Sequence, residues 1–216
     1  MKAYRVKASD SELLDPNNAA WRTARPEEHP LVPTPLKGNP AIVAVSPFIA
    51  ESTDHGSVRS IKAAALHNGE SIAFHLTWAS TGADKIIDLD QFVDGAGVMF
   101  PVVKDANAVT MGSPGKPVNI WYWKGDMNGD AFDVVAEGYG TSERRPGSKT
   151  KLQSSAVFKD GMWSLVLIRP LSAKDGTQFS AGTDSGIAFA AWDGANNERA
   201  GRKSFSGAFN TLEIEA

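Results

Sequence analysis

Residues 60–78 read Ser60-Ile-Lys-Ala-Ala-Ala-Leu-His-Asn-Gly-Glu-Ser-Ile-Ala-Phe-His-Leu-Thr-Trp78, and this stretch indicates the fold class. Its centre, Asn68-Gly69, is a turn signal because both residues tolerate positive φ. After the turn, apolar side chains recur at every second position, namely Ile72, Phe74, Leu76 and Trp78. A period of two is typical of a strand with one apolar face. The stretch therefore predicts a β-hairpin.

The rest of the chain repeats this pattern in short segments. A second hairpin is expected over residues 152–170 with its turn at Asp160-Gly161. Further strands are expected at residues 41–48, 97–102, 118–124, 186–192 and 209–214. No long segment has a period of 3.6, although short helical turns are expected near residues 84–92 and 104–110. These patterns predict an all-β protein, an antiparallel β-sandwich with short helical turns in its loops.

Length and composition fit one such domain. A chain of 216 residues can bury a substantial core, so we expect a single domain over residues 1–216. The 20 glycines and 12 prolines match many turns between short strands. Residues 1–40 are expected to form an extended segment, because prolines and polar residues crowd it, with Trp21 as its anchor.

Several classes of function are excluded or disfavoured. The chain has no cysteine, which excludes disulfides, thiolate metal sites and covalent haem attachment. No basic block suggests nucleic acid, and no run of roughly 20 apolar residues suggests a membrane span. Residues 1–7 lack the apolar region of a secretory signal, so we expect either a cytoplasmic protein or the mature form of an exported one.

The histidines do not suggest catalysis or metal binding. Their spacing, at His29, His55, His67 and His75, matches no metal motif. His67 and His75 lie on the two arms of the first hairpin and are expected to face solvent.

Two features suggest a ligand site. In Asn119-Ile-Trp-Tyr-Trp123 the tryptophans Trp121 and Trp123 share one strand face and form a broad apolar wall. That wall is either sandwich core, a surface for a flat cofactor, or a platform for sugar rings. Just upstream, Met111 lies in a loop with two glycines and two prolines, where periodicity gives it no core role.

The ordered set of such segments resembles a known family. The segments are the Met111-Gly112 loop leading into residues 117–124, then residues 163–171, 188–194 and 198–204. From about residue 60 to the end, the chain is similar to the haem-binding gamma subunits of ethylbenzene dehydrogenase. The wider group includes the gamma subunits of dimethylsulfide dehydrogenase, selenate reductase and chlorate reductase.

The resemblance implies a β-sandwich that holds one b-type haem between loops and sheet through a Met and a Lys. In this chain it implies Met111 and Lys203 as the iron ligands, with Lys124 and Lys116 as rival lysines. Because Trp121 and Trp123 share one strand face just after the Met111 loop, we also expect both to be largely buried, with at least one near the macrocycle. The resemblance also implies a non-catalytic electron-transfer subunit in a complex with a molybdopterin-containing alpha subunit and an iron–sulfur beta subunit. The complex would pass electrons to or from a soluble c-type cytochrome, usually in the periplasm.

The implied ligands make chemical sense. A thioether favours Fe(II), and two protein ligands leave no open position for a substrate, so such a haem carries electrons. The main alternative is a carbohydrate-binding β-sandwich that uses its tryptophans as sugar platforms, because fold does not fix function. A purely structural subunit is a third reading, but it gives the Met111 loop no purpose.

Overall fold

The computed structural model describes residues 1–127, 129–174 and 176–216, and it forms a sandwich of two β-layers. The first layer contains β10 (Gln153–Lys159), β11 (Met162–Pro170), β5 (Ser71–Ala79), β4 (Ser60–His67), β2 (Glu27–Pro30), β1 (Lys2–Arg5) and β14 (Asn210–Ile214). The second contains β6 (Gly95–Pro101), β7 (Val118–Lys124), β8 (Phe132–Ala136), β9 (Glu143–Pro146), β13 (Ser204–Phe205) and β3 (Val32–Pro33). The all-β sandwich predicted from the sequence is confirmed.

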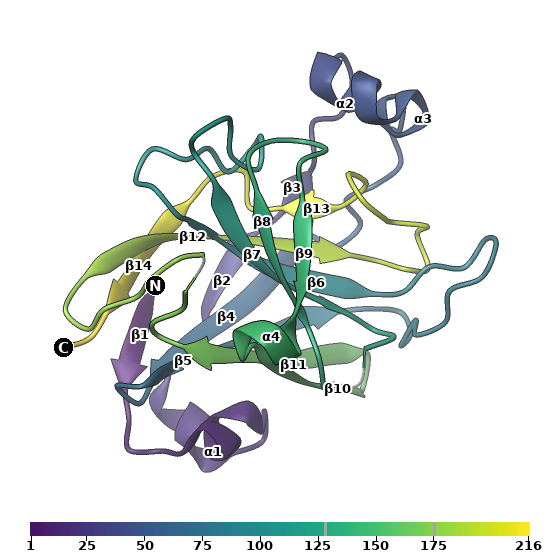
Figure 1. Ribbon diagram of the computed structural model, residues 1–216. Helices are drawn as coiled ribbons and strands as arrows, with labels where there is room; N and C mark the ends of the chain where they lie inside the picture. The colour runs from purple at the N-terminus through teal and green to yellow at the C-terminus, as the bar shows by residue number, and fades with distance from the viewer. Residues whose placement is uncertain (128, 175) are drawn as a thin grey trace.

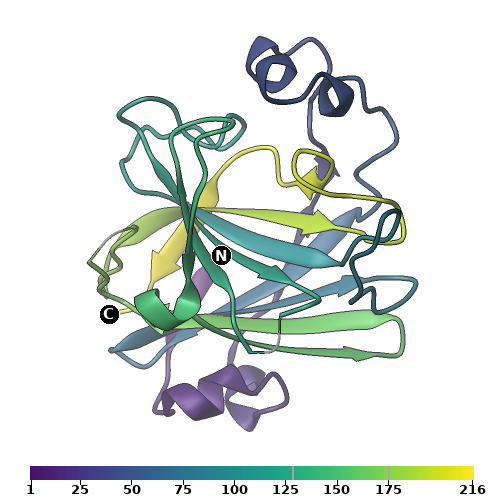
Figure 2. The same ribbon diagram turned by 45° about the vertical axis from the view of Figure 1, so that its right-hand side comes forward.

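One strand joins the two layers. In β12 (Asp184–Trp192), residues 184–187 pair with β14 of the first layer and residues 188–192 pair with β6 of the second. Most pairs are antiparallel, whereas β1 runs parallel to both of its neighbours, β4 and β14. Figure 1 shows β10 and β11 below β12 and β6, and Figure 2 shows the same two layers from another side. The main cluster of buried apolar side chains lies between the layers.

The two predicted hairpins are present. β4 and β5 pair antiparallel around Asn68 and Gly69, and β10 and β11 pair antiparallel around Asp160 and Gly161. Asp160 and Gly161 have φ of 52° and 75°, which is the backbone that a tight hairpin turn requires. The side chain of Asn68 accepts hydrogen bonds from two amides, those of Glu70 and Ser71, and so closes the first turn.

The N-terminal residues 1–40 add two strands to the first layer and one to the second, and their helical segments cover the outer side of the first layer. Residues 1–40 contain β1, α1 (Asp10–Leu14), the 3-10 helix η1 (Ala19–Thr23), β2 and β3. Trp21 is 8% exposed; its indole N–H donates to the carbonyl of Leu13, and its ring lies 5.0 Å from that of His75. Because this segment covers β4 and β5, the expectation that His67 and His75 face solvent is wrong. His67 is fully buried, and His75 is half-buried and bonded to Ser164.

The expected strand at residues 41–48 is also wrong, because this segment forms α2 (Pro40–Val45) and α3 (Pro47–Ala50). Each helix has a side-chain cap followed by proline at its first position. Asn39 accepts from the amide of Ala41, and Ser46 accepts from the amide of Ile49. These signals favour a helix start over the β-preference of the intervening residues. Figure 1 shows α2 and α3 projecting from one end of the sandwich.

The other helical element described is α4 (Gly147–Thr150). Short helical turns were expected at residues 84–92 and 104–110. Residues 84–92 are irregular with one bend, and residues 104–110 contain turns but no helix. None of the helices in the described ranges has both the length and the apolar character needed to cross a membrane.

Candidate functional site

The second layer has two faces, and the side chains of β7 alternate between them. Its inward side chains, Trp121 and Trp123, are 0% and 2% exposed and pack in the core between the layers. Trp121 lies edge-on to Phe74, and Trp123 lies edge-on to Trp163. The two tryptophans are therefore sandwich core, the first of the three roles open to them from the sequence. They do not line the cavity described next.

The outward side chains of β7, Ile120 and Tyr122, form part of a cavity floor on the opposite face. Paired residues continue this floor across the sheet, because directly opposite side chains share a face. One row is Arg144, Val134, Ile120, Met99 and Ala188, and the next is Phe132, Tyr122, Gly97, Ala190 and Phe205. Small residues at the centre, Gly97 and Ala190, leave space above the sheet.

Loops and helices close the space above this floor into a cavity of about 260 Å³. Its walls come from α2 and α3, from residues 108–111, from residues 139–144 and from residues 200–205. Most lining side chains are apolar or aromatic, including Ile42, Ile49, Val109, Tyr139, Trp192 and Phe205. Among the described residues, the lining contains no Asp, Glu or His. A cavity of this kind suits a largely apolar ligand.

Met111 enters the cavity from a tightly fixed loop. Its own φ is 57°, in the left-handed region that a side chain rarely adopts, and Gly112 follows with φ 85°. A Cβ on Gly112 would lie 2.7 Å from the carbonyl oxygen of Lys116, so only glycine fits there. Strained backbone of this kind persists where the surroundings hold it, and it often marks a functional site.

The neighbouring loop holds Met111 from the other side. The amide of Gly138 donates to the Met111 carbonyl at 2.9 Å, and the hydroxyl of Tyr139 donates to the carbonyl of Val109. Burial raises the pKa of Tyr139, so its hydroxyl stays a donor. The position of the thioether is thus set by backbone contacts on both sides of the residue.

Lys203 enters the same cavity from the start of β13. Its carbonyl accepts from both the amide and the hydroxyl of Thr34, at 3.1 and 3.2 Å. These bonds fix the backbone, so the long side chain extends inward and the residue is only 9% exposed. The ammonium nitrogen lies 5.1 Å from the centre of the Trp192 indole.

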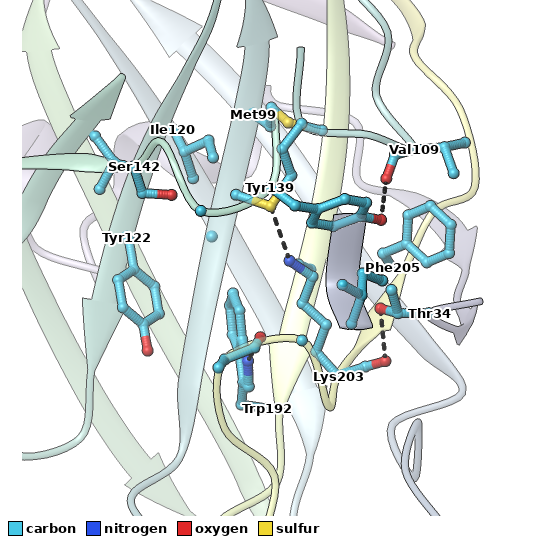
Figure 3. A pocket seen from close by; sticks show the side chains of 18 of the residues that line it. Thr34, Met99, Val109, Ile120, Tyr122, Tyr139, Ser142, Trp192, Lys203 and Phe205 are labelled. Atoms are coloured by element: carbon cyan, nitrogen blue, oxygen red, sulfur yellow. Dashed lines mark hydrogen bonds between the residues drawn. The ribbon is translucent and has the colours of Figure 1, made fainter. Parts of the chain in front are cut away.

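The structure brings Met111 and Lys203 together, although 92 positions separate them in the sequence. Lys203 Nζ lies 3.7 Å from Met111 Sδ (Figure 3). Within the described residues, Lys203 forms no ion pair with a carboxylate. Burial without such a partner lowers the pKa of Lys203 from 10.5 to about 8. An amine that loses its proton more readily than an ordinary lysine therefore faces a neutral thioether. Once the proton is lost, both groups are good ligands for a transition metal.

The two rival lysines lie elsewhere. Lys116 pairs with Asp105 at the surface, and Lys124 pairs with Asp126 at 3.1 Å. Neither lines the cavity. Of the four site residues predicted from the sequence, Met111 and Lys203 thus share one site, whereas Trp121 and Trp123 belong to the core behind it.

Sequence reasoning missed several parts of the cavity. Met99 supplies a second thioether from the floor, and α2 and α3 supply one wall. The alternation in β7 held a usable signal: once Trp121 and Trp123 face inward, Ile120 and Tyr122 must face outward. The helices could have been found from the paired Asn-Pro and Ser-Pro capping signals at residues 39–40 and 46–47.

Comparisons with known proteins identify the family of this chain. A family model described as ethylbenzene dehydrogenase matches residues 18–152 and 144–204. A Haloferax mediterranei protein named as a respiratory nitrate reductase heme subunit, ORF7, is 35% identical, and the match covers 90% of this chain and 76% of that protein. The chlorate reductase gamma subunit of Ideonella dechloratans is 32% identical over 92% of this chain and 78% of its own length. The dimethylsulfide dehydrogenase gamma subunit of Rhodovulum sulfidophilum is 33% identical over 62% of this chain and 52% of its own length.

Solved structures with a similar fold are more distant in sequence. A Bacteroides uniformis protein described as carbohydrate-binding has a TM-score of 0.58 at 11% identity, covering 100% of this chain and 98% of that one. A family 9 carbohydrate-binding module from Caldicellulosiruptor kristjanssonii, in complex with glucose, has a TM-score of 0.53 at 9% identity, covering 100% and 96%. At such identities the likeness describes the sandwich fold and says nothing of the ligand.

Proposed function

The chain belongs to the ethylbenzene dehydrogenase family, and from this premise we propose that it is the haem b-binding, electron-transfer subunit of an oxidoreductase complex. The observation that carries the proposal is the pair of Met111 and Lys203, which face one another inside an apolar cavity. The Haloferax mediterranei relative is named as a heme subunit, which supports the same cofactor.

The donor atoms of Met111 and Lys203 are arranged in a way that fits a haem. Lys203 Nζ and Met111 Sδ lie 3.7 Å apart inside the cavity, so both residues would be able to hold the same iron. The small residues of the floor, Gly97 and Ala190, leave room for a flat ring, and the apolar walls exclude water from it.

The proton on Lys203 decides whether its nitrogen can bind iron, because only the neutral amine has a free electron pair. At pH 7, removing the proton from a lysine of pKa 10.5 costs about 5 kcal/mol, at about 1.4 kcal/mol per unit. With the pKa lowered to about 8, that cost is only about 1 kcal/mol. Burial of Lys203 away from carboxylates therefore prepares it as a ligand.

A haem bound in this way would supply a one-electron carrier. Met111 and Lys203 would both hold the iron, which would leave no position for a substrate and would make the subunit non-catalytic. The neutral thioether of Met111 and the apolar walls both favour the reduced, less charged iron, and thus a higher reduction potential. Bond-making chemistry would belong to a partner subunit.

The proposed partners follow from the family. We expect a molybdopterin-containing alpha subunit and an iron–sulfur beta subunit, with a soluble c-type cytochrome as the external redox partner. The named gamma subunits of chlorate reductase and dimethylsulfide dehydrogenase support a place within a multi-subunit enzyme. A periplasmic location is part of the same proposal, with the cytoplasm as the alternative.

The carbohydrate-binding alternative is not favoured. Its sugar platforms were to be Trp121 and Trp123, and both are buried in the core. The structures described as carbohydrate-binding share only the fold with this chain.

Reconstitution with haem tests the proposal. The cofactor-free protein is titrated with ferric haem and followed by absorption, and the ferrous form is then exposed to carbon monoxide. We expect one haem per chain, a low-spin spectrum and no binding of carbon monoxide, because both axial positions are filled. A protein that stays colourless, or that binds haem weakly without a defined stoichiometry, would overturn the proposal.

A further inference from the structure

Two charged side chains line the cavity in the part of the chain that the structure describes, and they lie at different depths. Lys203 is buried inside, whereas Arg144 is exposed at the rim. Arg144 lies on β9, the edge strand of the second layer, where it pairs with Val134 in the outer row of the cavity floor. The cavity is therefore apolar along its floor and carries one accessible positive charge at its edge.

Arg144 differs from its neighbour Arg145 in how its charge is compensated. Arg145 points to the inner face of the layer and donates to Asp133 at 2.8 Å. Arg144 points outward, and no ion pair or side-chain hydrogen bond of the described residues involves it. Its guanidinium stacks on two rings, Tyr122 and Phe132, at 5.7 Å from each centre. Stacking holds the flat group in place and leaves its five N–H donors free.

Free donors of this geometry match a carboxylate, because the planar guanidinium binds both of its oxygens at once. The ligand that fits the whole cavity is thus a flat apolar body with a carboxylate on one edge. Haem has this form, since its ring carries two propionate groups on the same edge.

We propose that Arg144 binds a propionate of the haem at the cavity mouth. This inference rests on the proposed haem site and adds an orientation to it: the propionate edge points toward β9 and the apolar edge points inward. Ser142, whose side chain also lines the cavity, lies two residues before Arg144 and offers a hydroxyl on the same side. Two other arginines of this end, Arg199 and Arg202, do not line the cavity.

Titration with two forms of the ligand distinguishes a contact to the propionate from a general effect of the substitution on the cavity. Haem and its dimethyl ester have the same ring and iron, but the ester carries no charge on the propionates. Each is titrated into the cofactor-free wild type, Arg144→Gln and the control Arg22→Gln, a surface arginine in η1. Absorption gives the dissociation constant and the spin state in every case.

We expect the wild type and Arg22→Gln to bind haem about 3- to 30-fold more tightly than the ester, the range of a partly exposed charge-assisted pair. Arg144→Gln should lose this preference and keep the low-spin spectrum, because Met111 and Lys203 are unchanged. If Arg144→Gln still prefers haem as strongly as the wild type does, this inference is wrong while the haem site stands. If the wild type binds neither form, both proposals fail.

Discussion

Two buried cations lie on opposite faces of the second layer, and their surroundings differ sharply. Between the layers, Arg169 is 0% exposed; it donates to Asp133 at 2.8 Å, to Asn119 at 3.1 Å and to the carbonyl of Thr177. In the cavity, the close partners of the Lys203 side chain among the described residues are the thioether of Met111 and the face of Trp192. A buried charge normally has a partner of opposite charge. The contrast indicates that Arg169 serves the fold and that Lys203 is held ready for a ligand.

The arrangement around Arg169 explains how the two layers are joined at that end. Arg169 extends from β11 in the first layer, whereas Asn119 and Asp133 belong to β7 and β8 in the second. The guanidinium also lies 4.8 Å from the centre of the Trp121 ring. Every one of these contacts is on the core side of β7, so none of them reaches the cavity.

The largest expected effect is the loss of stability when Arg169 is replaced. Arg169→Met should lower the free energy of unfolding of the cofactor-free protein by about 3 to 5 kcal/mol, because it leaves Asp133 buried with one partner fewer. Lys203→Met should leave that free energy unchanged or raise it, because it removes a buried charge that has no carboxylate partner. Urea unfolding at pH 7 measures both. Equal losses in the two variants would contradict the distinction.

The next effect is a pH dependence of the free energy of unfolding that is caused by Lys203. Its pKa is lowered in the folded protein to about 8 from 10.5, so between these values the unfolded chain binds more protons. The free energy of unfolding should therefore rise with pH across this window, by about 3 kcal/mol in total at about 1.4 kcal/mol per unit.

The measurement is the difference in stability between wild type and Lys203→Met, both without cofactor, from pH 7 to pH 10.5. The difference should be constant below pH 8 and should shift in favour of the wild type above it. A flat difference over the whole range means that Lys203 has an ordinary pKa and is not prepared as a ligand.

A smaller expected effect distinguishes the two thioethers of the cavity, those of Met111 and Met99. Met111→Leu should weaken haem binding by at least the 10- to 100-fold typical of losing a supporting ligand contact, and should let carbon monoxide bind the ferrous form. Its reduction potential should also fall. Met99→Leu removes the other cavity sulfur with a similar change in volume, and it should do none of these things. If the two variants behave in the opposite way, Met99 is the ligand.

The fold was predictable wherever local pattern and tertiary context agree. The hairpin turns at Asn68-Gly69 and Asp160-Gly161 follow from residues that tolerate positive φ, and strand alternation marked the inner face of β5. The outer face of the same strand misled us about His75, because its cover is supplied by Trp21 from a segment far away in the sequence. Residues 41–48 misled us because their side chains favour strands, whereas the caps at Asn39 and Ser46 dictate helices.

The site was predictable only in part, for a related reason. The unusual loop around Met111 is visible in the sequence, since its glycine and proline content leaves the residue without a core role. The partnership with Lys203 is not visible, because it depends on β13 pairing with β3 and β12. The resemblance to the gamma subunits supplied that pairing of residues. The burial predicted for Trp121 and Trp123 is confirmed, but both lie on the core side of β7 and do not line the cavity.

The central claim is that Met111 and Lys203 are the two iron ligands, and a pH titration of the ferric haem protein tests it most directly. Wild type and the surface-lysine control Lys124→Ala should be low-spin at neutral pH and should lose that spectrum on acidification, as the Lys203 amine takes up a proton and leaves the iron. Lys203→Ala should lack the native low-spin spectrum across the whole range. If Lys203→Ala instead keeps both the native spectrum and the same acid transition, another residue is the ligand and the account of this cavity is wrong.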